Sequence, residues 1–156
     1  MASNFLEQLI REWYEFNHNF VTTNIKFGKL DHGGWAGEMD VLVLNPADST
    51  ATHIEASSDA STWEDRRIRV SKKFADASKH YKSVLPSGVK VTRKVAIIGT
   101  SRNPKEHLGI TGIQETSIPD FIEEVSNGIR GSNPMSEAIP EHWPLLRAIQ
   151  FAFHWG

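Results

Sequence analysis

The sequence contains no cysteine among its 156 residues. Disulfide bonds, thiolate nucleophiles and cysteine-ligated metals are therefore excluded, and any catalytic or metal-binding role must belong to other polar side chains. No apolar run approaches the roughly 20 residues that cross a bilayer. The first residues, MASNFLEQLIREW, also lack the apolar core of a signal peptide. We therefore expect a cytoplasmic protein with no membrane-embedded part.

Several motifs that identify enzymes are also absent. The histidines occur in neither an HxxxH nor an HExxH pattern, which argues against zinc hydrolase chemistry. Gly33, Gly34 and Gly37 form no phosphate-binding pattern, and no GxSxG nucleophile motif occurs. A zinc hydrolase, a nucleotide-binding protein and a serine hydrolase are therefore poor matches to this chain.

The length and composition, with 39 % hydrophobic and 23 % charged residues, are typical of one globular domain. Helical spacing of apolar residues and β-branched runs predict alternating elements. The order of these elements predicts an α/β fold, a single domain over residues 1–156 in which helices flank both faces of one mixed sheet. Helices are predicted at 3–17, 62–85, 119–128 and 144–155, and strands at 20–27, twice within 37–59, at 90–100 and at 108–118.

Acidic side chains mark two strands that a short turn joins. Since alternate strand residues share a face, Glu38 and Asp40 point one way and Met39 and Val41 the other. Glu55 on the next strand is expected close to Asp40, where two carboxylates repel unless a positive group lies between them. A divalent cation with oxygen ligands would supply that charge. The alternative is that these acids lie exposed on the open face of a hairpin, and the spacing leaves both interpretations open.

The first predicted helix adds a further acid. Successive residues turn by about 100°, so Glu12 lies at the edge of the apolar arc centred on Leu9, whereas Glu7 lies on the far side. A carboxylate at the margin of a buried face needs a partner. Glu12 is therefore either a third metal-site acid or the partner of a nearby lysine.

The helix predicted at 62–85 is rich in basic residues. Its apolar stripe places Lys73 and Arg66 along one edge, close to the body of the protein, while Lys72 points outward. Such a helix is either an anion-facing surface or an ordinary solvated helix face. Lys73 is the better placed of the two adjacent lysines to reach a site on the sheet.

This arrangement resembles the PD-(D/E)XK nuclease superfamily, which includes restriction endonucleases and Holliday junction resolvases. The matching stretches are GEMDVLV at 37–43, with an acid at the start of an apolar strand after a glycine loop, and IEAS at 54–57. The predicted order of helix, three strands, helix and strand over residues 3–99 also matches the superfamily core. The strand and helices predicted over 108–156 lie outside that match.

The resemblance implies a catalytic set. Asp40 and Glu55 would bind Mg²⁺, or Mn²⁺ in its place, together with the Ala56 carbonyl. The lysine of the family motif falls on Ser57, which carries no charge and can at most hydrogen-bond a water. Some members supply the lysine from the following helix, which would make Lys73 the substitute here.

Further residues would complete the interaction with substrate. Glu38 or Glu12 would support a second metal ion, and Arg66, Arg69 and Lys72 would grip the DNA backbone. The expected function is Mg²⁺-dependent hydrolysis of DNA phosphodiester bonds. The alternative is a catalytically inactive nuclease-fold protein that acts as a nucleic-acid-binding or assembly module.

Two apolar features lie outside this catalytic set: Trp35 and the last predicted helix. Trp35, on the glycine-rich loop, is predicted to cover the core rather than to stack on a base. The last helix is densely apolar, and we expect its surface to be buried in the core or against a second copy in a homodimer. Its apolar residues are Trp143, Leu145, Leu146, Ile149, Phe151, Phe153 and Trp155.

Overall fold

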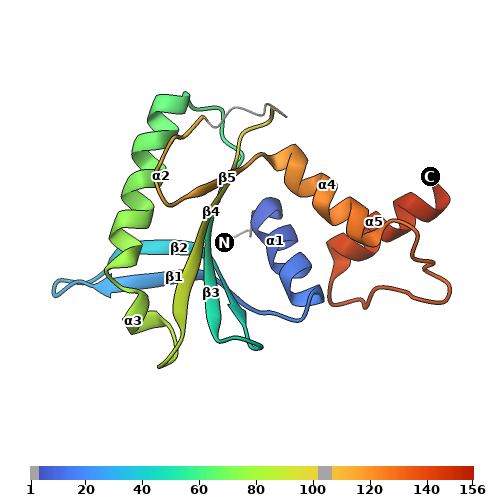
Figure 1. Cartoon of the computed structure of the whole chain (residues 1–156), viewed down its shortest axis with the longest axis horizontal. Coiled ribbons are helices and arrows are strands. Elements are labelled where there is room, and N and C mark those ends of the chain that lie inside the picture. Colours follow the sequence, from blue (N-terminus) through green and yellow to red (C-terminus); the bar gives the residue numbers. More distant parts are fainter. Residues whose placement is uncertain (1–3, 102–106) are drawn as a thin grey trace.

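A mixed sheet of five strands, in the order β1-β2-β3-β4-β5, forms the centre of the computed structural model (Figure 1). The structure describes residues 4–101 and 107–156. Strands β1 (Phe20–Lys29), β2 (Trp35–Asn45) and β3 (Thr50–Ser57) run antiparallel, and β4 (Lys90–Ile98) and β5 (Gln114–Thr116) continue parallel to β3. The predicted α/β class with one mixed sheet is confirmed.

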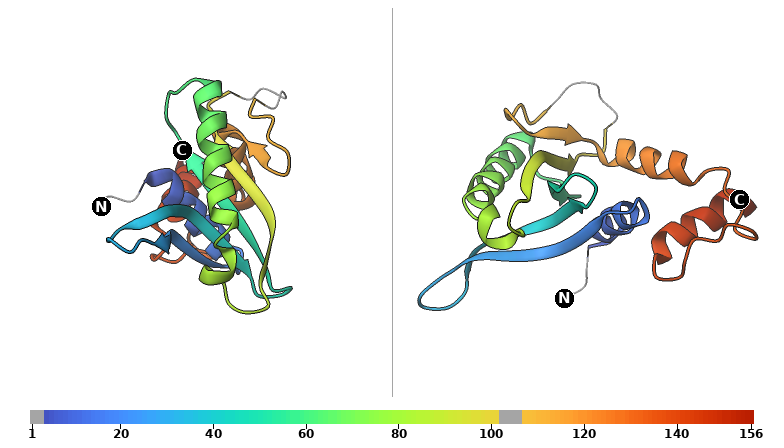
Figure 2. Two further views of the ribbon diagram at one scale, coloured as in Figure 1. Left: turned by 90° about the vertical axis from the view of Figure 1, so that its left-hand side faces the viewer. Right: turned by 60° about the horizontal axis from the view of Figure 1, so that its bottom comes forward.

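Helices cover both faces of this sheet (Figures 1 and 2). On one face lie α1 (Phe5–Phe16) and α4 (Ile118–Ile129), with α5 (Pro144–Trp155) packed against them, and on the other lie α2 (Trp63–Ser78) and α3 (Tyr81–Val84). Polar side chains cap the starts of α1, α2 and α4; at the start of α2, for example, the side chain of Thr62 accepts a hydrogen bond from the Asp65 N–H. None of the helices within 4–101 and 107–156 is long and apolar enough to cross a membrane.

The face under α1 carries one continuous apolar core. Its members come from α1, the central strands, α4 and α5, and most are at most 9 % exposed. Burial of this much apolar surface is the main stabilising contribution expected for the domain. The buried members are Leu6, Leu9, Ile10, Trp13, Val41, Val43, Ile54, Ala56, Val95, Ile97, Phe121, Val125, Ile129, Ile139 and Leu146.

The face under α2 is divided. Val70 and Phe74 pack on Ala96 and Ile98 of β4 in one cluster, whereas Ala77 belongs to a separate cluster with strands β1 and β2. Buried polar side chains of β3, including His53 and Glu55, also lie on this face. The apolar packing of α2 is thus interrupted by polar groups.

Two predicted elements are shorter than expected. The helix predicted at 62–85 is wrong as one unit, because α2 ends at Ser78 and α3 follows after a tight turn in which the His80 N–H bonds the Ala77 carbonyl. No glycine or proline marks this break. The strand predicted over 108–118 is confined to Gln114–Thr116.

The β1–β2 hairpin extends beyond the rest of the sheet, as the right-hand view of Figure 2 shows. Its loop turns at Gly33 and Gly34, which have φ of 97° and 82°, values that glycine adopts without strain. Trp35, next to this loop, is 46 % exposed, so the prediction that it covers the core is wrong.

Candidate active site

The candidate site lies where β2 and β3 separate. Their pairing runs from Asn45 opposite Thr50 to Val41 opposite Ile54, and Asp40 is the next residue along β2. The Asp40 carboxylate bridges the gap, since its Oδ2 accepts a hydrogen bond of 3.0 Å from the Ala56 N–H. A side chain thereby satisfies a backbone donor that the neighbouring strand leaves without a ladder partner.

The strict alternation predicted for β2 fails at this point. Met39 and Leu42 are three positions apart, so a regular strand would place them on opposite faces. Both nevertheless pack in the same cluster on the side of α2. Asn24, which lies across from Asp40 in the β1–β2 register, has φ of 54°, a left-handed conformation that distorts the ribbon.

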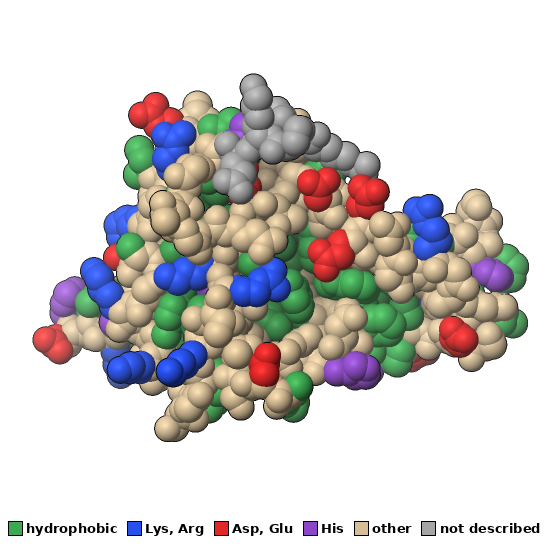
Figure 3. Space-filling model, in the orientation of Figure 1, with side chains coloured by type: hydrophobic (Ala, Val, Ile, Leu, Met, Phe, Trp, Pro, Cys, Tyr) green, Lys and Arg blue, Asp and Glu red, His purple; other side chains and the backbone are tan. Residues whose placement is uncertain are grey.

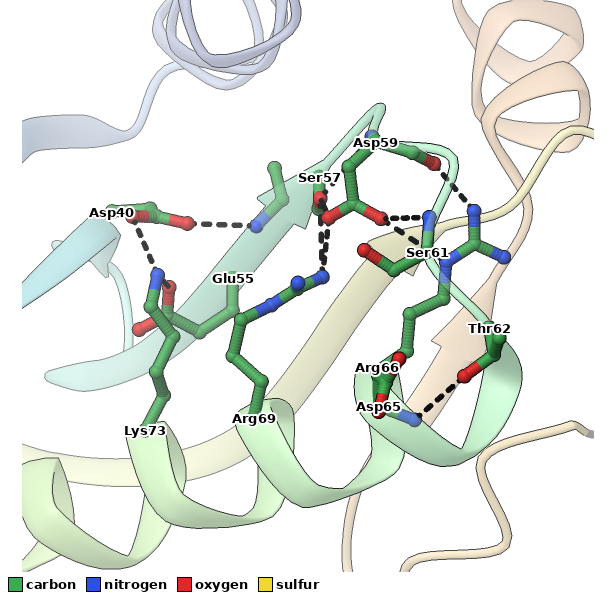
Figure 4. A network of polar contacts seen from close by, with 11 residues as sticks. Asp40, Glu55, Ser57, Asp59, Ser61, Thr62, Asp65, Arg66, Arg69 and Lys73 are labelled. Carbon is green, nitrogen blue, oxygen red and sulfur yellow. Dashed lines mark hydrogen bonds and ion pairs between the residues drawn. The ribbon is translucent and has the colours of Figure 1, made fainter.

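Lys73 reaches both carboxylates from α2 (Figure 4). Its Nζ lies 3.2 Å from Asp40 Oδ1 and 2.9 Å from Glu55 Oε2. Asp40 and Glu55 are 7 % and 3 % exposed, which excludes the alternative that these acids lie on an open hairpin face. The sequence reasoning that preferred Lys73 over Lys72 therefore selected the lysine that contacts the pair.

The electrostatics of the pair follow from burial and crowding. Burial raises the pKa of Asp40 to about 7, with further increases from the hydrogen bond and charge of Glu55, while the Lys73 charge opposes the change. Burial by itself lowers the pKa of Lys73, but the Glu55 and Asp40 carboxylates outweigh it and the net pKa is raised. Lys73 is therefore an ammonium ion, and its charge holds the two carboxylates together.

Glu55 has a second partner, which is His53. The ring Nε2 lies 3.0 Å from Glu55 Oε1, and Nδ1 lies 2.6 Å from the Tyr81 hydroxyl. Burial lowers the pKa of His53 to about 3, so the ring is neutral. Because a carboxylate only accepts, Nε2 carries the proton and Nδ1 accepts from Tyr81. This contact fixes Oε1 of Glu55 and leaves Oε2 facing Lys73.

Sequence reasoning assigned no role to His53 or Tyr81. The available signal was period-two spacing, since His53 and Glu55 occupy alternate positions of one strand and share a face. Tyr81 carried no such signal, because its position depends on the break between α2 and α3.

Glu12 lies on the buried side of α1, as its helical angle predicted, but its partners are neither a metal-site acid nor a lysine. Glu12 is fully buried, and its Oε1 accepts hydrogen bonds from the Leu145 and Leu146 N–H groups at the start of α5, at 2.8 and 3.2 Å. Glu12 thus stabilises the N-terminus of α5 and does not join Asp40, contrary to the metal role predicted for it. Glu7 is the α1 acid that senses the pair. Burial raises the pKa of Glu7, and the nearby charge of Asp40 raises it further.

Ser57 and the two arginines of α2 surround a different acid, Asp59. The Ser57 hydroxyl and the Arg69 guanidinium both donate to Asp59 Oδ2, and Arg66 Nε lies 3.4 Å from Oδ1 (Figure 4). Arg66 is only 8 % exposed and lies over the Trp63 ring. The prediction that Arg66 grips DNA is therefore wrong, since its guanidinium is buried in the protein. Ser57 likewise faces Asp59.

The other predicted residues lie at the periphery. Lys72 points outward with its side chain 74 % exposed and pairs with Asp76 at 2.6 Å. Glu38 is half-buried and opposite Lys26 in the register of β1 and β2. Within residues 4–101 and 107–156, no three acidic or histidine side chains gather as a metal cluster. The cavity between Asp40, Glu55 and Lys73 has a volume of about 20 Å³, roughly that of one water position.

The last helix divides its apolar residues between core and surface. Leu146 is fully buried and Ile149 packs against the core, as expected if this helix buries its apolar surface in the core. Phe151, Phe153 and Trp155 are 43 %, 39 % and 64 % exposed.

Comparison with known proteins establishes the fold alone. No family model matches the sequence, and no curated protein is significantly similar to it. The chain is similar to a crystal structure of a protein of unknown function, AF1548, with a TM-score of 0.56 and 18 % sequence identity. The match covers 94 % of this chain and 78 % of that one. Any function must therefore be argued from the site.

Proposed function

We propose that this protein is a metal-dependent nuclease of the PD-(D/E)XK type that hydrolyses phosphodiester bonds in DNA. The observation that carries the proposal is the position of Lys73, whose ammonium contacts both Asp40 and Glu55. A lysine beside two buried carboxylates at a strand fork is the set that the superfamily resemblance requires, with the lysine supplied by α2 in place of Ser57. A cytoplasmic location, where DNA is accessible, is part of the same proposal.

The donor set at the fork fits a magnesium ion. Asp40 and Glu55 offer carboxylate oxygens, the donors that Mg²⁺ prefers, and Mg²⁺ in proteins commonly keeps several waters. The Lys73 ammonium between them marks a place where positive charge is already stabilised. Asp40, Glu55 and the Ala56 carbonyl would hold the ion. When bound, Mg²⁺ would supply positive charge near the scissile phosphate and a more acidic water.

The remaining groups position these ligands. The Ala56 N–H fixes one oxygen of Asp40, and His53 fixes one oxygen of Glu55, so each carboxylate keeps its other oxygen toward Lys73. Lys73 would orient the attacking water and offset the charge that develops on the phosphate. Burial raises the pKa of Glu7, and the charges of Asp40 and Glu38 raise it further, so these three acids together would attract a second cation.

The surface supports a polyanionic partner. On the face shown in Figure 3, Lys and Arg side chains gather over the left half, where Figure 1 places α2, α3 and the start of β4. Lys72 and Arg69 of α2 are exposed to a degree that allows contact with phosphate. Contacts of this kind are independent of sequence and weaken with salt.

One observation favours a second candidate, the inactive nuclease-fold module. The ammonium already contacts both carboxylates and offsets one negative charge, and the cavity of about 20 Å³ leaves no room for a hydrated ion unless Lys73 withdraws. A site of this kind would serve folding, while the basic surface would still bind nucleic acid.

A cleavage assay separates the two candidates. Duplex, single-stranded and branched DNA would be incubated with Mg²⁺ or Mn²⁺, using the wild type, Asp40→Asn and the surface control Glu141→Gln. A nuclease requires metal-dependent cleavage that Asp40→Asn lowers by at least about 100-fold and that Glu141→Gln leaves intact. DNA binding without cleavage under all conditions would favour the inactive module. Absence of both would reject DNA as the partner.

The proposal includes a homodimer formed through α5. Phe151, Phe153 and Trp155 expose apolar surface on this helix, and nucleases of this type commonly cut two strands as pairs. Sedimentation equilibrium should show a dimer that Trp155→Ala weakens. A monomer at all concentrations would remove this part of the proposal and leave the active site unaffected.

A further inference from the structure

The carboxylate of Asp59 is surrounded by donors, as Figure 4 shows. Oδ2 accepts from the Arg69 guanidinium and the Ser57 hydroxyl, and Oδ1 accepts from the Ser61 N–H at 3.0 Å and from Arg66 Nε at 3.4 Å. Two guanidinium groups, a hydroxyl and a backbone N–H around one anion make up the donor set of an oxyanion site. The occupant here is a side chain of the protein itself.

This donor set adjoins the candidate active site. Ser57 and Arg69 line the same cavity as Asp40, Glu55 and Lys73. Arg69 lies four residues before Lys73 on α2, a distance of about 6 Å along the helix axis, and on the same side of it. A strand whose scissile phosphate lies at Lys73 would therefore carry a neighbouring phosphate toward Arg69.

The two arginines differ in how firmly the protein holds them. Arg66 is 8 % exposed, lies 4.5 Å from the Trp63 ring centroid and also donates to the Asp59 carbonyl, so it keeps its place without the Asp59 side chain. The side chains of Arg69 and Asp59 are 39 % and 33 % exposed. The contact between Arg69 and Asp59 can therefore open toward solvent, whereas Arg66 stays buried.

We propose that Ser57 and Arg69 form a subsite for a non-scissile phosphate of the DNA strand, and that the Asp59 carboxylate occupies this subsite until a phosphate displaces it. The inference rests on the proposed function and extends it, because it assigns Ser57 a role that does not require the charge of the missing lysine. Arg69 recognises phosphate and carboxylate with the same planar donors, so the exchange needs no new geometry. Asp59 thereby lowers the affinity of the free protein for DNA.

The test compares two aspartates that pair with cations of α2. Asp59→Asn frees Arg69, and the matched control Asp76→Asn frees Lys72 with the same change in net charge. Binding of a short fluorescent duplex would be measured at low salt in EDTA, so that cleavage does not interfere. We expect Asp59→Asn to tighten binding by about tenfold and Asp76→Asn by less than about threefold.

A second substitution assigns the gain to the subsite. Arg69→Gln in the Asp59→Asn background should abolish the tenfold gain, and Ser57→Ala in that background should reduce it. Inorganic phosphate should compete with the duplex more strongly in Asp59→Asn than in the wild type. If Asp59→Asn is unfolded by circular dichroism, Asp59→Ser, which keeps a hydroxyl for the Ser61 N–H, carries the same expectation.

Two results would overturn the subsite. Equal gains in Asp59→Asn and Asp76→Asn would show a general charge effect, and no gain in Asp59→Asn would show that Asp59 serves only to hold the loop after β3. In either case, DNA binding and metal-dependent cleavage by the wild type would leave the nuclease proposal standing. Loss of both activities in the wild type would instead reject the nuclease proposal together with the subsite.

Discussion

The two faces of the sheet are built in different ways. Under α1, α4 and α5, apolar side chains form one core with the buried Glu12 and Gln150 beside it, while under α2 the apolar contacts fall into two clusters with His53, Glu55 and Lys73 beside them. The first face stabilises the fold by burying apolar surface. On the second face, charged side chains at the fork of β2 and β3 take the place of part of that apolar packing. The face under α1 therefore supports the domain, and the face under α2 carries the candidate site.

The polar face is nevertheless fully hydrogen-bonded. Among the described residues, the buried side-chain polar atom without a partner is Nε1 of Trp143, which packs against the α1-side core. The buried atoms of His53, Glu55 and Asp40 all have partners. Since an unsatisfied buried group is costly, this complete pairing lets the α2 face carry charges without unfolding the domain.

The largest expected loss of stability comes from a substitution in the apolar core under α1. Ile10 is fully buried in the core under α1, and Ile10→Ala should lower the free energy of unfolding by about 3 kcal/mol, because it leaves a cavity that neighbouring side chains fill only in part. Urea denaturation would measure the loss. The control Phe5→Ala, at a side chain that is 77 % exposed, should change stability by less than about 0.5 kcal/mol. Similar losses in both variants would contradict the assignment of this core.

The next prediction separates the two glutamates of α1. Glu12→Ala should cost about 2 kcal/mol of stability, because the Leu145 and Leu146 N–H groups lose their acceptor. Its cleavage rate per folded molecule should be unchanged. Glu7→Gln should show the reverse, with wild-type stability and altered metal dependence of cleavage. A loss of metal binding in Glu12→Ala that is absent from Glu7→Gln would restore the metal role to Glu12.

A smaller effect, on metal affinity, is expected when His53, the hydrogen-bond partner of Glu55, is replaced. His53→Gln should weaken Mn²⁺ binding by 10- to 100-fold, since groups that orient metal ligands typically contribute that much. Tyr81→Phe, which removes one hydroxyl and leaves the ring in place, should have a weaker effect in the same direction. Isothermal titration calorimetry would measure both variants. Unchanged affinity in both would mean that Glu55 needs no support from His53.

The pH dependence of stability sharpens the comparison further. Between its ordinary pKa of 6.5 and its folded value of about 3, His53 binds a proton in the unfolded chain but not in the native one, so its contribution to stability rises with pH. Asp40, with a pKa raised from 3.8 to about 7, holds its proton in the native state and loses it on unfolding, so its contribution falls with pH. The two contributions oppose each other over about pH 4 to 6.5.

Asp40→Asn removes one of these opposing contributions. From pH 4.5 to 6, the free energy of unfolding of this variant should rise with pH more steeply than that of the wild type, by up to about 1.4 kcal/mol per pH unit. Urea denaturation at several pH values would measure the two slopes. Equal slopes would contradict the raised pKa that burial gives Asp40.

Much of the fold could be predicted from the sequence, because apolar spacing sets the element order. The helices predicted at 119–128 and 144–155 match α4 and α5, and the strand predicted at 90–100 matches β4. The break after Ser78 could not be predicted, since no glycine or proline marks it and the apolar stripe continues to Leu85.

The site was predicted in part for similar reasons. Strand periodicity brought Asp40 and Glu55 together, and helix periodicity selected Lys73 over Lys72. Glu12 was placed on the buried side of α1 correctly, but its partner was not predicted, because the helical angle could not reveal that the start of α5 would cover Glu12. Arg66 was predicted to face DNA, but its partner Asp59 lies on a loop whose conformation no periodic pattern indicates.

The measurement that tests the central claim most directly compares the two adjacent lysines of α2. Lys73→Met and Lys72→Met each remove one positive charge at neighbouring positions. Lys73 contacts Asp40 and Glu55, whereas Lys72 pairs with Asp76. We expect Lys73→Met to abolish Mg²⁺-dependent DNA cleavage while the fold is retained, and Lys72→Met to weaken DNA binding a few-fold with cleavage at saturating DNA preserved. Undiminished cleavage in Lys73→Met would contradict the account.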